Sequence, residues 1–163
     1  MWSCNRRAAL LGLAALAGCG FAPAYGPGSP ARGLLDRVEI DAPADKNAFD
    51  LVERLEERLG RAQAPVWRLS YAIDVQSVNR TVTPTNAITR YTLNGTADFT
   101  LRDLATDRVV TSGTVRTFTS YSASGTPVAT LASEADANLR LMRLLADQIV
   151  TRLIATSGEW GGQ

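Results

Sequence analysis

Three stretches in the middle of the chain alternate apolar and polar residues with a period of two. The first follows Pro65, the second runs from Arg90 to Arg102, and the third, dense in Thr, Val and aromatic residues, runs from Val109 to Tyr121. A period of two buries one face of a strand, so each stretch predicts a strand. The turn-rich residues 103–108 predict a hairpin between the last two strands, and residues 79–89 predict a longer, mobile connection between the first two. The apolar positions of the first two strands are Leu69, Tyr71, Ile73, Val75, Tyr91, Leu93, Ala97, Phe99 and Leu101.

A period near 3.6 residues predicts two helices, one on each side of these strands. The first covers residues 48–59, with Asn47 as its cap and Gly60 as its stop. The residues predicted to form its buried stripe are Ala48, Phe49, Leu51, Val52, Leu55 and Leu59. Ser133, with Asp136 three residues later, opens a second helix that reaches Ile154 and turns Leu141, Met142, Leu145, Ile149 and Leu153 inward. Charged residues on both helices, among them Arg54, Arg58 and Asp147, are interpreted as solvated faces.

A short strand over residues 34–40 completes the predicted order strand, helix, three strands, helix. This order predicts an α+β fold in which two helices pack on one face of a four-stranded sheet. The single domain is expected over residues 33–157, followed by a C-terminal tail at 158–163. The opposite face of the sheet is expected to be polar and to carry Arg68, Asp74, Gln76, Arg90, Thr92, Asn94, Arg102, Thr114 and Arg116.

The first residues have the pattern of a secretory signal. Arg6 and Arg7 precede a run of about ten apolar residues, which is half the length that a membrane-spanning helix needs. The run ends in Leu16-Ala17-Gly18-Cys19, which resembles the bacterial lipobox. The resemblance predicts a signal peptide at 1–18, cleavage between Gly18 and Cys19, and a diacylglycerol and an N-acyl chain on Cys19. The alternative is an ordinary signal peptide with a chance cysteine behind it.

The Pro- and Gly-rich residues 19–32 are expected to form a lipidated flexible tether. Because Cys4 leaves with the signal, no thiol remains after lipidation for a disulfide, a metal or a nucleophile. Gly20 rather than Asp follows Cys19, which in proteobacterial lipoproteins implies sorting to the outer membrane. A lipid anchor of two or three acyl chains would be effectively permanent.

The composition of the chain excludes several kinds of catalytic and binding site. The 163 residues suit one domain and include no His, so catalytic triads and His-rich metal sites are excluded. Loss of Arg6 and Arg7 leaves one more acidic than basic side chain, which gives no electrostatic footprint for nucleic acid. The carboxylate pairs Glu56-Glu57 and Glu134-Asp136 lie on predicted solvent faces. The sequence therefore predicts neither an enzyme nor a cofactor or metal site.

The opening of the mature chain, Cys19-Gly20-Phe21-Ala22-Pro23-Ala24-Tyr25-Gly26, resembles the CGFxPxYG opening of the alphaproteobacterial lipopolysaccharide-assembly lipoproteins, the LptE family. The Thr-rich strand at 109–124, the stretch 131–138 and the long Leu- and Ile-rich helix are similar to the C-terminal half of that family. The resemblance covers nearly the whole mature chain. It implies a non-catalytic outer-membrane lipoprotein, facing the periplasm, that plugs the lumen of the barrel LptD, assists its assembly and engages lipopolysaccharide.

A contact with lipopolysaccharide would need cations for the lipid A phosphates, and Arg binds phosphate in bidentate geometry. Arg90 and Arg116 are the candidate contacts, because they share the polar face and would be adjacent if the second and third alternating strands pair. The alternative function is an auxiliary periplasmic lipoprotein of a lipid-trafficking ABC transporter, or a small ligand-binding module of the same build. The stable partner of the chain distinguishes these two functions.

Overall fold

A computed structural model of the chain describes residues 26, 29–82, 88–123 and 126–160. A 3-10 helix, η1 (Pro30–Leu34), leads into β1 (Val38–Ile40) and α2 (Lys46–Leu59). The long strands β2 (Trp67–Val82), β3 (Ile88–Asp103) and β4 (Val109–Ser122) follow, and α3 (Pro127–Trp160) ends the described chain. The strands form one sheet in the order β1-β2-β3-β4, with β1 parallel to β2 and the other pairs antiparallel.

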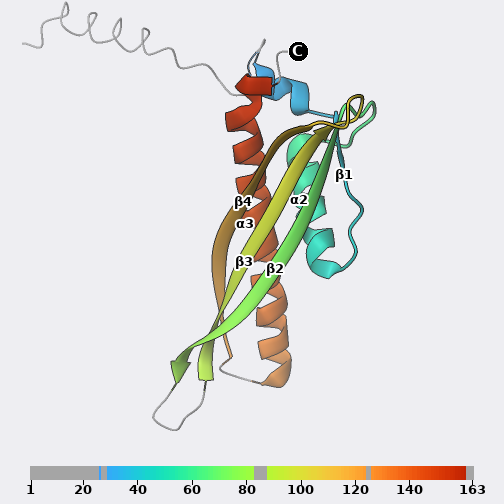
Figure 1. Cartoon of the computed structure of the whole chain (residues 1–163). Coiled ribbons are helices and arrows are strands. Elements are labelled where there is room, and N and C mark those ends of the chain that lie inside the picture. The colour runs from blue at the N-terminus through green and yellow to red at the C-terminus, as the bar shows by residue number, and fades with distance from the viewer. Residues whose placement is uncertain (1–25, 27–28, 83–87, 124–125, 161–163) are drawn as a thin grey trace, which may run out of the picture.

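Both long helices lie on the same side of the sheet, and α3 runs along most of its length (Figure 1). The predicted α+β fold, with its order of strands and helices, is confirmed. The core forms between the helices and the odd-numbered residues of β2, β3 and β4, because alternate residues of a strand point to opposite faces. Its buried members include Leu69, Leu93, Phe99, Leu101 and Val115 from the sheet and Leu51, Leu55, Leu141, Leu145, Ile149 and Leu153 from the helices.

The hairpin predicted between β3 and β4 is confirmed and turns at residues 103–108. The carboxylate of Asp103 accepts hydrogen bonds from the backbone N–H groups of Ala105 and Thr106, both at 2.8 Å. The bond from Thr106 lowers the pKa of Asp103, because it stabilises the charged carboxylate. On the core face, the stacked rings of Tyr91 and Tyr121 lie 5.2 Å apart between the same two strands.

The first part of the domain differs from the prediction for residues 30–40. Only Val38–Ile40 form a strand, whereas Pro30–Leu34 form η1, and Ala31 and Leu34 are buried. Residues 30–32 were expected in the tether, but proline fits the first turn of a helix, where its missing N–H costs nothing. The domain therefore begins near Pro30, while residues 1–25 and 27–28 lie outside the described residues.

The helix predicted at 48–59 is present. The predicted cap and one of the predicted buried residues, Phe49, were wrong. Asp45 caps the helix, accepting a 2.8 Å hydrogen bond from the N–H of Ala48, so Asn47 lies inside it. Phe49 is 54% exposed, since each residue turns a helix by roughly 100° and this one lies beside the buried stripe. Gly60 ends the helix as predicted, with a positive φ of 78° that favours glycine.

The last helix is longer than the predicted range of 133–154. It starts at Pro127, where the side chain of Thr126 accepts a hydrogen bond from the N–H of Ala129 at 3.3 Å. Ser133 is not a cap, because its hydroxyl donates to the carbonyl of Ala129 within the helix. At the other end the helix includes residues 158–160, which were expected in a tail, and residues 161–163 lie outside the described residues.

The connection predicted at 79–89 is shorter than expected. Strand β2 continues to Val82 and β3 starts at Ile88, with a register shift after Asn79. Of the connection predicted at 79–89, residues 83–87 are the part that belongs to neither strand, and they lie outside the described residues. The pairing of β2 with β3 therefore extends further along both strands than the sequence pattern indicates, because a bulge lets it continue past the shift.

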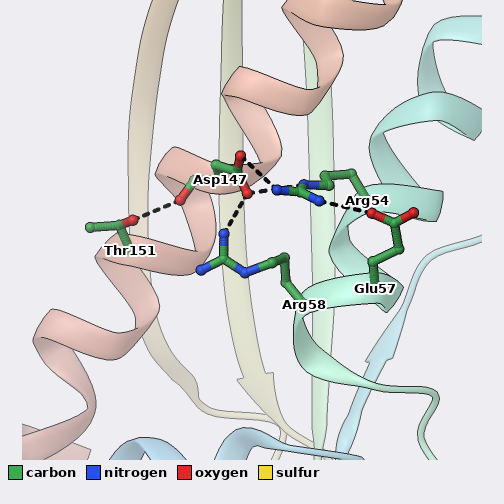
Figure 2. A network of polar contacts seen from close by, with 5 residues as sticks. All are labelled: Arg54, Glu57, Arg58, Asp147 and Thr151. Atoms are coloured by element: carbon green, nitrogen blue, oxygen red, sulfur yellow. Dashed lines mark hydrogen bonds and ion pairs between the residues drawn. The ribbon is translucent and has the colours of Figure 1, made fainter. Parts of the chain in front are cut away.

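The charged faces of α2 and α3 meet in an ion-pair cluster between the helices (Figure 2). The Nε and Nη2 atoms of Arg54 each lie 3.1 Å from an oxygen of Asp147, and Nη1 of Arg58 lies 2.6 Å from Asp147 Oδ1. Arg54 also contacts Glu57, and its bonds to Asp147 and Glu57 raise its pKa. The prediction that these residues only form solvated faces was wrong, because it treated each helix alone.

Replacement of Asp147 by Asn is expected to lower the free energy of unfolding by about 1 kcal/mol at this site, which is one-third exposed, since it leaves Arg58 without a carboxylate and Arg54 with Glu57 alone. The matched control is Asp136→Asn on the same helix. It breaks an ion pair with Arg140 whose side chains are more exposed, so a smaller loss is expected. Urea denaturation of both variants measures the difference, and equal losses would show that the cluster adds no stability of its own.

Candidate functional site

The face of the sheet turned away from the helices is polar, as predicted. The register places all nine predicted residues on even-numbered positions of β2, β3 and β4, which share one face. Arg68 pairs with Glu39 at 3.0 Å, Asp98 accepts a hydrogen bond from Thr114, and Gln76 donates to Asp74. No helix of the described chain covers this face. A surface with many hydrogen-bonding groups and more arginines than carboxylates results.

Arg90 and Arg116 lie on this face, but the expected adjacency was wrong. Arg90 lies opposite Ser122, whereas Arg116 lies opposite Thr96, six positions further along β3. At about 3.4 Å per residue this separates the two backbone positions by roughly 20 Å. Both side chains are exposed. The strands pair as expected, so the error was in the register, which the alternating pattern does not specify.

Arg116 has a different basic neighbour, which the sequence analysis did not select. Arg116 and Thr114 of β4 line a hollow of about 410 Å³ together with Gln148 and Arg152 of α3. Neither arginine has an acidic partner among the described residues. Arg152 was missed because its position beside β4 depends on how α3 crosses the sheet. Two unpaired guanidinium groups on one hollow form a candidate site for a carboxylate or a phosphate.

Phe118 is the largest apolar side chain on the polar face. It is 67% exposed, lies two positions from Arg116 on β4, and faces Asn94 across the sheet. Single exposed apolar residues are common on protein surfaces. Here the exposed ring and the unpaired arginine lie side by side on the strand at the end of the sheet. We call this surface, formed by Ser112, Thr114, Arg116 and Phe118, the β4 edge.

A second hollow is lined by residues in and just after η1, by the β3–β4 turn and by the last residues of α3. These segments lie at the same end of the molecule (Figure 1). The hollow has a volume of about 420 Å³, and its lining includes Arg37, Arg108, Asp103 and Glu159. Trp67 and Trp160 also line it, with their rings edge to face at a centroid distance of 5.3 Å. Trp160, expected in a tail, is thus packed against the sheet, and it donates a hydrogen bond to Thr156.

The described residues contain no cluster of His, Cys, Asp or Glu that could hold a metal ion. Within the same residues, no helix combines the length and hydropathy that crossing a membrane requires. Gly18 and Cys19, the predicted cleavage and lipidation residues, lie outside the described part of the chain. Their roles stay predictions.

Comparison with known protein families identifies the family of this chain. Residues 35–153 match the family described as LptE, lipopolysaccharide-assembly. The chain belongs to this family. The match includes all four strands and both long helices except the C-terminal end of α3, so it covers the polar sheet face and the hollow at Arg116. LptE proteins are non-enzymatic lipoproteins of lipopolysaccharide transport and take no cofactor, as the sequence analysis expected.

Solved structures show the same fold. A protein from Caulobacter crescentus described as a lipoprotein aligns with a TM-score of 0.67 and 23% identity over 82% of this chain and 97% of its own. The rare lipoprotein B of Shewanella oneidensis gives 0.59 and 14%, covering 76% and 96% of the two chains. A minor lipoprotein of Acinetobacter baumannii gives 0.56 and 20%, covering 74% and 94%. No match was found among curated proteins.

The family makes this LptE protein a membrane-associated lipoprotein of lipopolysaccharide assembly. LptE proteins work with LptD and with lipopolysaccharide. The features that these partners could use are the polar sheet face, the β4 edge and the hollow shared by Arg116 and Arg152.

Proposed function

We propose that this protein is anchored in the outer membrane through Cys19, faces the periplasm, and plugs the lumen of an LptD barrel whose assembly it assists. The observation that supports the proposal most is the uncovered polar face of a long sheet in a chain of the LptE family. The lumen of an outer-membrane barrel is polar, so a plug needs a surface that exchanges water for hydrogen bonds with polar groups.

The shape of the domain supports the same role. The strands β2 and β3 each have 16 residues, which at about 3.3 Å per residue gives an extended sheet roughly 50 Å long. Such a sheet is longer than the apolar band of a barrel, which is about 25 Å tall. The first described residues lie at one end of it, with the β3–β4 turn (Figure 1). The opposite end carries the long hairpin, which can extend away from the anchored end.

Depletion of the protein in its host tests this function. The fraction of LptD that migrates as a folded, heat-modifiable barrel is expected to fall, followed by the amount of lipopolysaccharide at the cell surface. Re-expression of the wild-type chain should restore both quantities. Normal barrel folding and normal surface lipopolysaccharide in depleted cells would contradict the proposal.

Direct contact with lipopolysaccharide is proposed for Arg90 and Arg116, both exposed on the polar face. Because their backbone positions lie roughly 20 Å apart, the two would bind separate anionic groups, and losses from single substitutions should add in free energy. We expect Arg90→Ala and Arg116→Ala each to weaken binding of purified lipopolysaccharide about fivefold, as for a charge-assisted hydrogen bond at an exposed site.

Binding is measured with the purified protein alone, without its barrel. Arg61→Ala is the control, because Arg61 is an exposed arginine at the end of α2 that pairs with Glu56. Unchanged binding by the Arg90→Ala, Arg116→Ala double variant would show that these side chains are not the contacts.

A further inference from the structure

The β4 edge has backbone groups that the sheet does not use. In an antiparallel ladder the N–H and C=O of one residue point to the same side, and successive residues alternate sides. The carbonyl of Leu69 on β2 accepts a bond from Asp41 and so faces away from β3, and the N–H of Asp103 on β3 bonds Arg108 on the β4 side. With the register, this puts the backbone groups of the odd-numbered residues of β4 toward β3 and those of the even-numbered residues away from the sheet. One contact supports this assignment, because the carbonyl of Ser120 accepts a hydrogen bond from Arg140 on α3. Ser112, Thr114, Arg116 and Phe118 thus present outward-facing N–H and C=O groups.

These four residues have no backbone partner on their outer side within the described chain. Unpaired edges of this length invite pairing with another strand, and proteins usually blunt them with lysine, proline or a bulge. Between Thr111 and Ser122 the edge has none of these, since its only charge is Arg116 and its register is regular. The β4 edge can therefore accept an added strand of about seven residues.

The charge around the edge indicates which strand fits. Arg116 and Arg152 line the hollow beside Thr114 and have no acidic partner in the described chain. The other open edge, residues 70–78 of β2, has no such cations, and the charged side chain in that stretch is Asp74. Directly opposite residues on neighbouring strands interact through their side chains. A strand on β4 should place a carboxylate opposite Arg116 and an apolar side chain, two positions away, opposite Phe118.

A second copy of this chain fits the edge poorly. Two β4 strands paired antiparallel about Arg116 would set like charges opposite each other, which destabilises a sheet. The wall of a closed barrel fits no better, because all its strands are already paired on both sides. The two arginines, unpaired in the described chain, thus favour an extended acidic segment that is not itself a strand of a barrel wall.

We propose that the β4 edge binds an extended acidic segment of the barrel partner as an added strand, with Arg116 and Arg152 holding its carboxylate. This inference rests on the proposed function, since the partner is the barrel named there. With the strand in place, Arg116 is engaged, and Arg90 is the polar-face candidate still open to lipopolysaccharide. The added strand would set the position of the plug relative to the barrel, which contacts through the polar face alone would not do.

Proline substitution tests the backbone contacts directly. Thr114→Pro and Ser112→Pro each remove an outward-facing N–H and leave the ladder to β3 intact, which edge strands tolerate. Thr114→Ala and Ser112→Ala remove the same side-chain groups and keep the N–H. Ser77→Pro makes the equivalent change on the open edge of β2. Each variant is expressed as the full lipidated chain, its fold is checked by thermal unfolding, and the barrel that co-purifies is quantified.

The proline variants on β4 are expected to recover at least fivefold less barrel than their alanine partners, while Ser77→Pro recovers as much as the wild type. Charge reversal gives a second test that leaves the backbone unchanged. Arg116→Glu combined with Arg152→Glu should lose the barrel, whereas Arg143→Glu, an exposed change on α3 outside the hollow, should keep it. A photo-crosslinking residue at Phe118 should join the chain to one acidic segment of the barrel.

Other results overturn the inference in distinguishable ways. Full barrel recovery by the folded proline and charge-reversal variants would overturn strand addition and leave the proposed function standing. Failure of the wild type to recover a barrel would overturn both. Crosslinks from Phe118 to a second copy of the chain would replace the barrel segment with self-association.

Discussion

Replacement of Cys19 by Ser is expected to abolish acylation and processing of the chain and to remove it from the outer membrane. Transfer of a diacylglycerol needs the thiol, and cleavage before residue 19 follows that transfer in the lipobox that this sequence resembles. Each buried CH₂ of an acyl chain contributes about 0.8 kcal/mol to membrane binding, so two or three chains make the anchor effectively permanent.

Cys4→Ser is the matched control for this experiment, because Cys4 lies in the predicted signal peptide and should be discarded with it. Metabolic labelling with an alkyne fatty acid, with separation of inner and outer membranes, measures both variants. The Cys4→Ser chain should be labelled and reach the outer membrane like the wild type. A labelled, correctly located Cys19→Ser chain would contradict the lipoprotein assignment of this residue.

Gly95→Val is expected to cause the largest loss of stability, about 3 kcal/mol. Gly95 lies in the middle of β3 on the face that contacts α3, where a Cβ would come within 3.0 Å of Leu141 Cγ and Cδ2. Leu141 is fully buried, so it cannot turn away into solvent. Inserting bulk into a packed core typically costs 1–3 kcal/mol, and the two γ-methyl groups of valine add to the contact made by its Cβ.

Gly158→Ala is the control, since Gly158 lies near the end of α3 and a Cβ there meets no atom within 4 Å. It should be neutral or stabilise the helix by up to roughly 1 kcal/mol. Chemical denaturation of both variants gives the comparison. Equal stability of the two would show that α3 does not approach the sheet as closely at Leu141 as the structure has it.

The sequence pattern predicted the features that local backbone geometry determines, such as the two faces of each strand. It missed the features that depend on contacts between residues far apart in the sequence. Alternation in β2 and β3 correctly assigned the two faces of the sheet, because side-chain direction follows from local backbone geometry. Phe49 was placed wrongly, since the width of a buried stripe depends on how the helix packs. The cluster of Arg54, Arg58 and Asp147 was missed for a similar reason, as its partners lie on helices far apart in sequence.

The candidate site shows the same limit. The polar face was predictable, because it needs only the period of each strand. The neighbours of Arg116 were not, because a register shift moves every cross-strand partner without changing the pattern. Arg152 became relevant only when the crossing of α3 over β4 was known. The β4 edge likewise depends on strand order, which puts β4 rather than β3 at the end of the sheet.

The most direct test of the proposed function is affinity purification of the Cys19-lipidated chain from outer membranes in mild detergent, with the bound proteins identified and quantified by mass spectrometry. The proposal predicts one large outer-membrane barrel of the LptD type at a ratio near one to one. Recovery of transporter subunits in its place would support the alternative of an auxiliary lipoprotein for a lipid-trafficking transporter. If the transporter co-purifies, or if no stable partner does, the proposal that this chain plugs an LptD barrel is contradicted.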